Sequence, residues 1–248
     1  MSKIKNKYIK KAKRKKRIKR IIVLLIFVII LGTVFVTKTD TFLITNVECS
    51  GENLVTGDYV LEKGKTFKGE NLFLLSKKTI EDTLRKNPYI DTIKIKKKLP
   101  NTIIVEVTEK KGLFYIYDGD YNNIISEEMM VLEKKDTIDG DELIKISGID
   151  LVDIDLGQKF SKSNRVASIL EEIYKEQSVI KKNKEDFSIT ELNLGDLSDI
   201  KVYFGNIEIK IGSDKNLRKK MSDAVNIYKS GLVTEYIDVS FDGTPDFK

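Results

Sequence analysis

The feature that most constrains this chain is a run of sixteen residues without a charge, Ile21–Val36. The run has no polar face, whereas a helix packed on a soluble core normally has one. A cleaved signal peptide would have a shorter apolar part and a small-residue cleavage site after it. A helix needs about 20 apolar residues to span a bilayer, and Ile18 and flanking lysines that snorkel to the headgroups extend this one. The sequence therefore predicts an uncleaved transmembrane signal anchor over residues 21–37.

The charge of the chain is divided at this run. Residues 1–20 contain 12 of the 44 Lys and Arg residues and no acidic residue, so the rest holds 32 basic and 38 acidic residues. A basic arm can bind nucleic acid, but an arm that leads directly into an apolar segment more typically sets membrane orientation. We therefore expect residues 1–20 to be a cytoplasmic tail, the residues after Lys38 to lie outside the cytoplasm, and nucleic acid not to be a partner.

The residue types exclude several kinds of catalytic and metal site. The chain has no His and a single cysteine, Cys49, which excludes a Ser-His-Asp centre, an HExxH zinc site and an intrachain disulfide. The acid-rich stretch 118–155 could hold the carboxylate pair of a cell-wall hydrolase, but its acids fall between short predicted strands, where solvated loops are expected. Neither Asp139-x-Asp141 nor Asp150-x-x-Asp153-x-Asp155 has EF-hand spacing. We predict a protein that is not an enzyme and has no cofactor and no metal.

The first part of the outer region, residues 42–109, has the pattern of a small α+β unit. Its predicted order is strand, helix, helix, strand, strand. Thr56 would cap the first helix and Gly64 would end it, while Ser76 would cap the second. The last two strands alternate with period two and flank the turn Leu99-Pro100-Asn101, which indicates a hairpin with one buried face. The predicted helices are 57–62 and 77–86, and the predicted hairpin strands are 92–96 and 102–108.

The second part, residues 112–241, has the pattern of a mixed β-sheet unit with two helices. Ser161 or Ser163 would cap the first helix, the second would follow Ser213, and Gly205-Asn206 would form a hairpin turn. The residues after it, 242–248, are expected to fray as a short tail. The predicted strands are 113–117, 123–125, 129–132, 143–146, 189–194, 201–204, 207–211 and 235–241.

The last predicted strand, Glu235–Phe241, is a candidate for the edge of the sheet. Exposed edges accept a strand from another chain, with pockets for alternate side chains. A strand buried between neighbours is the alternative, and position in the sequence does not separate the two. If the run is an edge, a Val239→Pro change should remove a backbone donor and block strand addition.

The strongest basic cluster outside the arm consists of Lys94, Lys96, Lys97 and Lys98, with Lys110 and Lys111 further along the chain. A solvated strand face is one interpretation. The other is contact with anionic headgroups, an acidic wall polymer or an acidic segment of a partner.

Several short motifs occur along the outer region in a fixed order. They are Phe42-Leu-Ile-Thr-Asn-Val47, Gly51-Glu-Asn53, Gly69-Glu-Asn-Leu-Phe73, Asn87-Pro-Tyr-Ile90, Leu99–Glu109, Ile211-Gly212, Lys219-Lys220 and Tyr236-Ile-Asp-Val-Ser240. By these motifs and the order of its elements, the chain resembles the bacterial division proteins FtsQ and DivIB, and its first outer unit resembles a POTRA domain. Where the family often has Arg and Pro after the last strand of that domain, this chain has Lys110-Lys111-Gly112.

The resemblance implies an α+β protein with one transmembrane helix, a POTRA domain over 42–109 and an FtsQ/DivIB β domain over 112–241. It implies a non-enzymatic scaffold of septum formation, held in the cell membrane as a single-pass type II protein at the division septum. The implied partners are FtsL-like and FtsB/DivIC-like division proteins and the septal peptidoglycan synthase complex, whose activity the protein would help to control. A POTRA-containing membrane protein of secretion or sporulation stays open as the alternative. The implied partner-binding residues are Lys229, Tyr236, Ile237, Asp238, Val239, Ser240 and Phe241.

Overall fold

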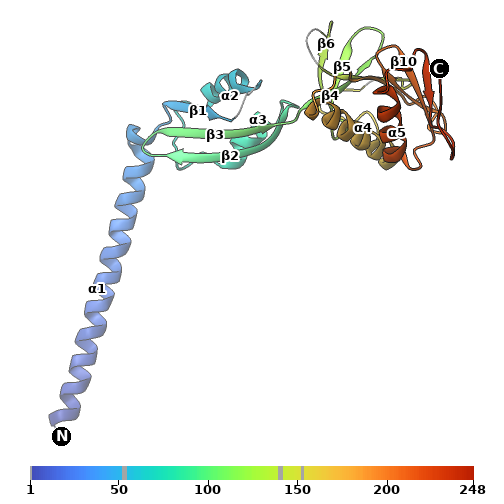
Figure 1. Cartoon of the computed structure of the whole chain (residues 1–248). Coiled ribbons are helices and arrows are strands. Elements are labelled where there is room, and N and C mark those ends of the chain that lie inside the picture. The colour runs from blue at the N-terminus through green and yellow to red at the C-terminus, as the bar shows by residue number, and fades with distance from the viewer. Residues whose placement is uncertain (1, 52–54, 139–141, 152–153) are drawn as a thin grey trace. The chain divides into compact units, whose positions relative to one another are not determined.

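The computed structural model describes residues 2–51, 55–138, 142–151 and 154–248, with side chains from residue 14 onward. The chain divides into two compact units, the first formed by residues 1–86 with 92–108 and the second by 87–91 with 109–248. Both units combine helices with β-sheet (Figure 1), so the predicted α+β fold class is confirmed.

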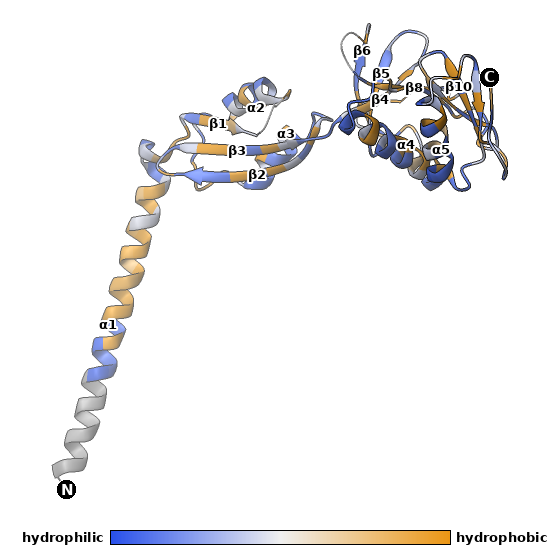
Figure 2. Ribbon diagram, viewed as in Figure 1, coloured by the Kyte–Doolittle hydropathy of each residue, from blue (hydrophilic) through white to orange (hydrophobic). Residues whose placement is uncertain are grey.

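The first helix, α1 (Ser2–Lys38), carries the basic arm and the apolar run as one continuous element. Its segment Arg14–Lys38 is long and apolar enough to cross a membrane, and none of the tested window is buried by the rest of the chain. Figure 2 shows a hydrophilic stretch at the start of this segment and mostly apolar colour along the rest of it. A helix satisfies its own backbone hydrogen bonds, so a single one is suited to anchor the chain in a bilayer.

The remainder of the first unit has the predicted order of elements. Its three-stranded sheet has the order β1-β3-β2, in which β1 is parallel to β3. The inward faces of the hairpin and the two short helices bury the core of the unit, which includes Ile80, Leu84 and Ile103. The elements are β1 (Asn46–Ser50), α2 (Gly57–Gly64), the 3-10 helix η2 (Lys65–Phe67), α3 (Lys77–Leu84), β2 (Ile90–Lys98) and β3 (Thr102–Glu109).

Local sequence explains the ends of these helices only in part. Ser76 caps α3 as predicted, since its hydroxyl accepts a hydrogen bond from the Thr79 amide at 3.0 Å. The predicted position of α2 is confirmed, since it begins after Thr56 and ends at Gly64, but neither end is made in the expected way. Within the described residues Thr56 makes no capping hydrogen bond to α2 through its side chain, and Gly64 continues the helical backbone. A Cβ on Gly64 would lie 2.7 Å from Val47 Cγ1, so the glycine is needed there because α2 approaches β1 closely.

The second unit is built on a nine-stranded sheet with the order β12-β11-β10-β9-β8-β7-β4-β5-β6. Every predicted strand and helix of this region forms, with ends that shift by a few residues. The elements are β4 (Gly112–Tyr117), β5 (Asn122–Ser126), β6 (Val131–Lys135), β7 (Ile144–Ser147), α4 (Asn164–Lys182), β8 (Ile189–Asn193), β9 (Ile200–Phe204), β10 (Ile207–Gly212), α5 (Leu217–Tyr228), β11 (Tyr236–Asp238) and β12 (Asp246–Phe247).

Helices α4 and α5 lie side by side against this sheet (Figure 1). Ser163 caps α4 through its hydroxyl, and the Ile169 and Ile173 side chains point from that helix into the core. Gly205 has a φ of +59°, the left-handed conformation that the two-residue turn between β9 and β10 requires. The expectation that residues 242–248 fray is wrong, because Asp246–Phe247 form β12 and pair with β11.

Candidate partner-binding edge

The predicted docking strand, β11, is not itself the outermost strand of the sheet. It pairs in parallel with β10 on one side, where Ile237 lies opposite Ile209. On the other side it pairs antiparallel with β12, where Ile237 lies opposite Phe247. Of the two alternatives that the sequence left open for this run, the structure shows a strand between neighbours, since the chain's own last residues lie along its outer side.

The backbone hydrogen bonds show which residues of β11 face each neighbour. The Val239 amide donates to the Lys210 carbonyl at 3.0 Å, which places this donor on the β10 side. The Tyr236 amide donates to the Lys248 carbonyl at 3.3 Å, and the Tyr236 carbonyl accepts from the Lys248 amide at 3.1 Å. A proline at Val239 would thus break a bond inside the sheet. The Tyr236 amide and carbonyl both face the side on which a strand would be added.

The strand that covers this side, β12, is short and exposed. It contributes only two residues, and 41% of the Phe247 surface is exposed. The Tyr236 hydroxyl donates to Asp246 Oδ2 at 3.0 Å, and the Lys210 ammonium lies 4.3 Å from the centre of the Tyr236 ring. The hydrogen bond to Asp246, together with the negative charge of that carboxylate, raises the pKa of Tyr236.

Beneath the edge, a buried lysine fixes the chain that follows β11. The Lys220 ammonium on α5 donates to the carbonyls of Ile211 at 2.8 Å, Ser213 at 3.1 Å and Ser240 at 3.3 Å. Gly212 has a φ of +66°, and a Cβ there would lie 2.9 Å from Ser240 Cβ. Sequence reasoning placed Ile211-Gly212 and Lys219-Lys220 in the resemblance but assigned them no role in the structure. The sequence signal for such a role is that Lys220 occupies a position of the predicted helix whose helical spacing places it on the face toward the core.

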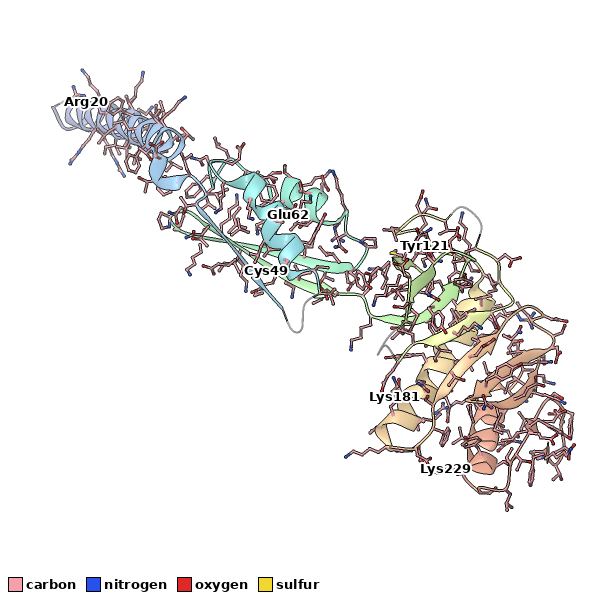
Figure 3. The ribbon with its side chains drawn as sticks, turned by 90° about the horizontal axis from the view of Figure 1, so that it is seen from above. Arg20, Cys49, Glu62, Tyr121, Lys181 and Lys229 are labelled. Atoms are coloured by element: carbon pink, nitrogen blue, oxygen red, sulfur yellow. The ribbon has the colours of Figure 1, made fainter. Side chains whose placement is uncertain are left out.

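The other predicted site residues divide into buried and accessible groups. Ile237 and Val239 are buried, Asp238 accepts hydrogen bonds from the Ser240 amide and hydroxyl, and Phe241 is exposed. Lys229, labelled in Figure 3, lies at the end of α5 and pairs with Glu185 Oε1 at 2.6 Å. It lines a cavity of about 350 Å³ whose other walls include Phe187 and Tyr228. Tyr236–Phe241 therefore form one continuous segment, whereas Lys229 forms its ion pair with the loop before β8.

The basic cluster on β2 is largely engaged by neighbouring groups. Lys96 pairs with Glu106, and Lys98 lies 3.6 Å from Glu48. The Lys97 ammonium donates to the Leu75 carbonyl at 2.7 Å, and burial, together with the nearby charge of Lys77, lowers its pKa.

The acid-rich stretch contributes a structured turn. Asp118 accepts hydrogen bonds from the Tyr121 amide at 2.7 Å and the Asn123 side chain at 2.8 Å, and these bonds lower its pKa to about 2. Asp139, Asp141 and Asp153 lie outside the described residues, and the acids and Cys49 that are described form no cluster of three able to hold a metal ion.

These features define the class to which the chain belongs: proteins with an apolar N-terminal helix, a small strand-helix-helix-strand-strand unit and a larger mixed sheet. The family described as "POTRA domain, FtsQ-type" matches residues 42–110. Cell division protein DivIB of Clostridium botulinum (strain Hall) is 35% identical over 248 residues, covering 98% of this chain and 95% of that protein. DivIB of Clostridium acetobutylicum is 32% identical over 84% of this chain and 83% of its own length. FtsQ of Corynebacterium glutamicum is 31% identical over 43% of this chain and 47% of its own.

The chain belongs to the DivIB/FtsQ family of cell division proteins.

Proposed function

We propose that this protein is a non-enzymatic scaffold of the division machinery that binds FtsL-like and FtsB/DivIC-like bitopic partners. In this proposal a partner segment adds a strand to β11, and the resulting complex helps to control the septal peptidoglycan synthase complex. Residues 1–20 are the cytoplasmic tail and residues 21–37 cross the membrane. The POTRA domain (42–109) and the β domain (112–241) lie outside, at the septum, and the tail 242–248 regulates access to the edge.

The observation that carries the proposal is the weak cover over β11. β12 makes two residue pairs with β11, and beyond them only Lys248 adds backbone hydrogen bonds, to Thr234, Glu235 and Tyr236, whereas the neighbouring strands β10 and β9 pair over five residues. A longer partner strand in the place of β12 would make more backbone hydrogen bonds and cover Tyr236 and the exposed Phe241. Because β12 is so short, we infer that partner binding displaces it.

The proposed orientation rests on charge. The 12 basic residues before the apolar run favour the cytoplasmic side. The family of the chain and the apolar character of α1 both agree with membrane anchoring. The relatives are cell division proteins by name, which favours the septum over the secretion or sporulation alternative.

The binding edge can be tested with the full-length chain and its FtsL-like and DivIC-like partners from the same bacterium. A Tyr236→Pro change removes the donor that faces the added strand, so partner affinity should fall about tenfold or more, the effect of losing about 1.4 kcal/mol. Tyr236→Phe is the matched control, because it keeps the backbone donor and removes only the bond to Asp246. Wild-type affinity in a folded Tyr236→Pro protein would contradict the proposed edge.

The biological role can be tested by depleting the protein from cells. Filamentous cells without septa are expected if the scaffold acts in division. Normal septa combined with an export or spore defect would support the alternative instead.

A further inference from the structure

We propose that the loop formed by residues 71–75, between η2 and α3, is a lipid contact of the POTRA domain. In this proposal Phe73 and Leu74 lie at the boundary between headgroups and acyl chains, next to the point where α1 leaves the bilayer. The inference rests on the proposed crossing of the membrane by α1 and adds a second attachment to it. The partner is the bilayer surface itself.

The loop is joined directly to the end of the apolar helix. The Asn71 side-chain amide donates to the Val36 carbonyl at 2.8 Å, and its oxygen accepts from the Phe73 amide at 2.9 Å. Carbonyls of the last helical turn have no partner within the helix, so Asn71 satisfies one of them and shapes the loop at the same time. The Leu72 amide also donates to the Phe42 carbonyl at 2.8 Å. These bonds hold the loop beside the last turn of α1.

Two side chains of the loop carry apolar surface outward. Leu72 is fully buried, whereas Phe73 is 49% exposed and Leu74 is 67% exposed. The Phe73 ring packs edge-on against Phe42 at 5.2 Å, and Phe42 packs edge-on against Phe35 of α1 at 6.1 Å. The exposed apolar surface of the helix therefore continues through a row of aromatic rings onto the loop. Single exposed apolar residues are common on soluble surfaces, but an exposed patch that is continuous with a membrane span indicates a lipid-facing surface.

The length of the apolar run supports the same conclusion. Sixteen residues span about 24 Å at 1.5 Å per residue, whereas the hydrocarbon core of a bilayer is about 30 Å thick. A short span is accommodated by local thinning of the bilayer and by snorkelling of the flanking residues, and thinning brings the acyl region closer to the residues that follow the span. The last turn of α1, and with it the attached loop, would then lie at the depth of the headgroups.

The charges around the loop fit an anionic surface. Exposed Lys68, Lys77 and Lys78 flank it, with one exposed acid, Glu70, on the same stretch. Half-buried Lys97 donates to the Leu75 carbonyl at 2.7 Å and closes the loop from the β2 side. A net basic surface beside exposed apolar residues is attracted to anionic lipid.

The chain contains no tryptophan, so single tryptophans can report the depth of each position. We would reconstitute full-length Phe27→Trp, Phe73→Trp and Thr92→Trp proteins in vesicles of phosphatidylcholine and phosphatidylglycerol. Further vesicles would carry bromine on the acyl chains, one set near the carbonyl end to report on the depth of residue 73 and one set near the terminal methyl to report on the depth of residue 27. Phe27 lies within the apolar run and reports on the membrane interior. Thr92 is the control for a position in water, because it is exposed near the start of β2, about 20 Å along the strand from the tip of the β2–β3 hairpin at 3.3 Å per residue.

Brominated lipid should quench the emission of the Phe27→Trp and Phe73→Trp proteins, and the Phe73→Trp emission should shift to the blue. The Thr92→Trp emission should be quenched by aqueous acrylamide and not by lipid. If Phe73→Trp behaves like Thr92→Trp while Phe27→Trp is quenched, the loop contact is wrong and the membrane crossing stands. If Phe27→Trp also escapes lipid quenching, the crossing and the loop contact are both overturned.

A charge placed in the loop gives an independent test. Adding Leu74→Asp to the Phe73→Trp protein should abolish the quenching by brominated lipid, because a carboxylate resists transfer from water to the acyl region. Leu61→Asp, at an exposed leucine of α2, is the matched control and should leave the quenching unchanged. Equal quenching in both double variants, with native circular dichroism, would contradict the proposal.

Discussion

At the scale of single residues, the candidate edge depends on groups that do not belong to β11. Lys220 and Gly212 together fix Ser240, two residues after the end of β11. The charged ammonium is satisfied by three carbonyls, which offsets the cost of its burial. The glycine accepts a backbone conformation and a close approach that a side chain would prevent. These two contacts therefore fix the chain just after β11 against α5 and the end of β10.

Lys220→Met should lower the free energy of unfolding by about 2 kcal/mol, because three carbonyls lose a charged donor and part of that loss is repaid by the apolar side chain. Urea denaturation followed by circular dichroism measures the change. Lys219→Met, at the exposed neighbour on α5, should leave the stability within about 0.5 kcal/mol of the wild type. An equal loss in both variants would show that the three hydrogen bonds contribute little.

Asp118 should make the stability of the second unit depend on acid pH. Its hydrogen bonds to Asn123 and Tyr121 lower its pKa from 3.8 to about 2, so its contribution is fully present above pH 3.8. The contribution is lost as the pH falls toward 2, since the folded carboxylate is then protonated. Asp118→Asn should be less stable than the wild type at neutral pH by about 1 kcal/mol, with the difference shrinking between about pH 4 and pH 2.

Urea unfolding across this pH range provides the measurement. Asp120→Asn, in the same turn, is the control and should show no such convergence. A difference between Asp118→Asn and the wild type that stays constant down to pH 2 would contradict the assignment.

At the scale of elements, hydrophobic periodicity predicted the helices and strands of both units. Ser76 was correctly expected as a cap, and of the two candidates for α4, Ser161 and Ser163, the second forms the cap. Residues that alternate over five positions or repeat at helical spacing carry this information locally. The two-residue strand β12 has no such period, so its pairing with Ile237 could not be expected. The sides to which Tyr236 and Val239 direct their backbone donors depend on register, which tertiary contacts set.

The competition between β12 and a partner can be measured by ending the chain at Phe241. Loss of residues 242–248 should increase partner affinity by up to about tenfold, because the partner no longer has to displace a strand. Tyr236→Phe should change affinity in the same direction by less, since only the Asp246 bond is lost. Surface plasmon resonance with immobilised partner measures both. Weaker binding of the shortened chain would show that β12 is part of the binding surface.

At the scale of the whole molecule, charge and hydropathy are distributed so that one end of the chain differs from the rest. The basic arm and the apolar run form a single helix, and the residues beyond it carry a net excess of acid. The sequence was sufficient to predict this arrangement, because it depends on composition and not on register. In our proposal the same distribution sets how the chain is oriented in the membrane.

Replacing the basic residues of 1–20 with Gln should leave the anchor inserted but remove the bias that sets its direction. Protease added to intact protoplasts should digest the outer units of the wild-type chain completely. In the variant with the neutralised arm, the protease should leave a share of these units undigested, because some chains would be inserted in the opposite direction. Gln at Lys94, Lys96 and Lys98 is the control, because those charges lie far along the chain from the span. Full digestion of every variant would argue against charge as the determinant of orientation.

The position of β12 also affects how this protein should be labelled for microscopy. A fluorescent protein joined directly after Lys248 would begin next to Tyr236, since the Lys248 backbone bonds to that residue. Such a reporter would crowd the surface whose occupancy it was meant to reveal. Fusions at the opposite terminus, on the basic arm, keep the bulky reporter away from that surface.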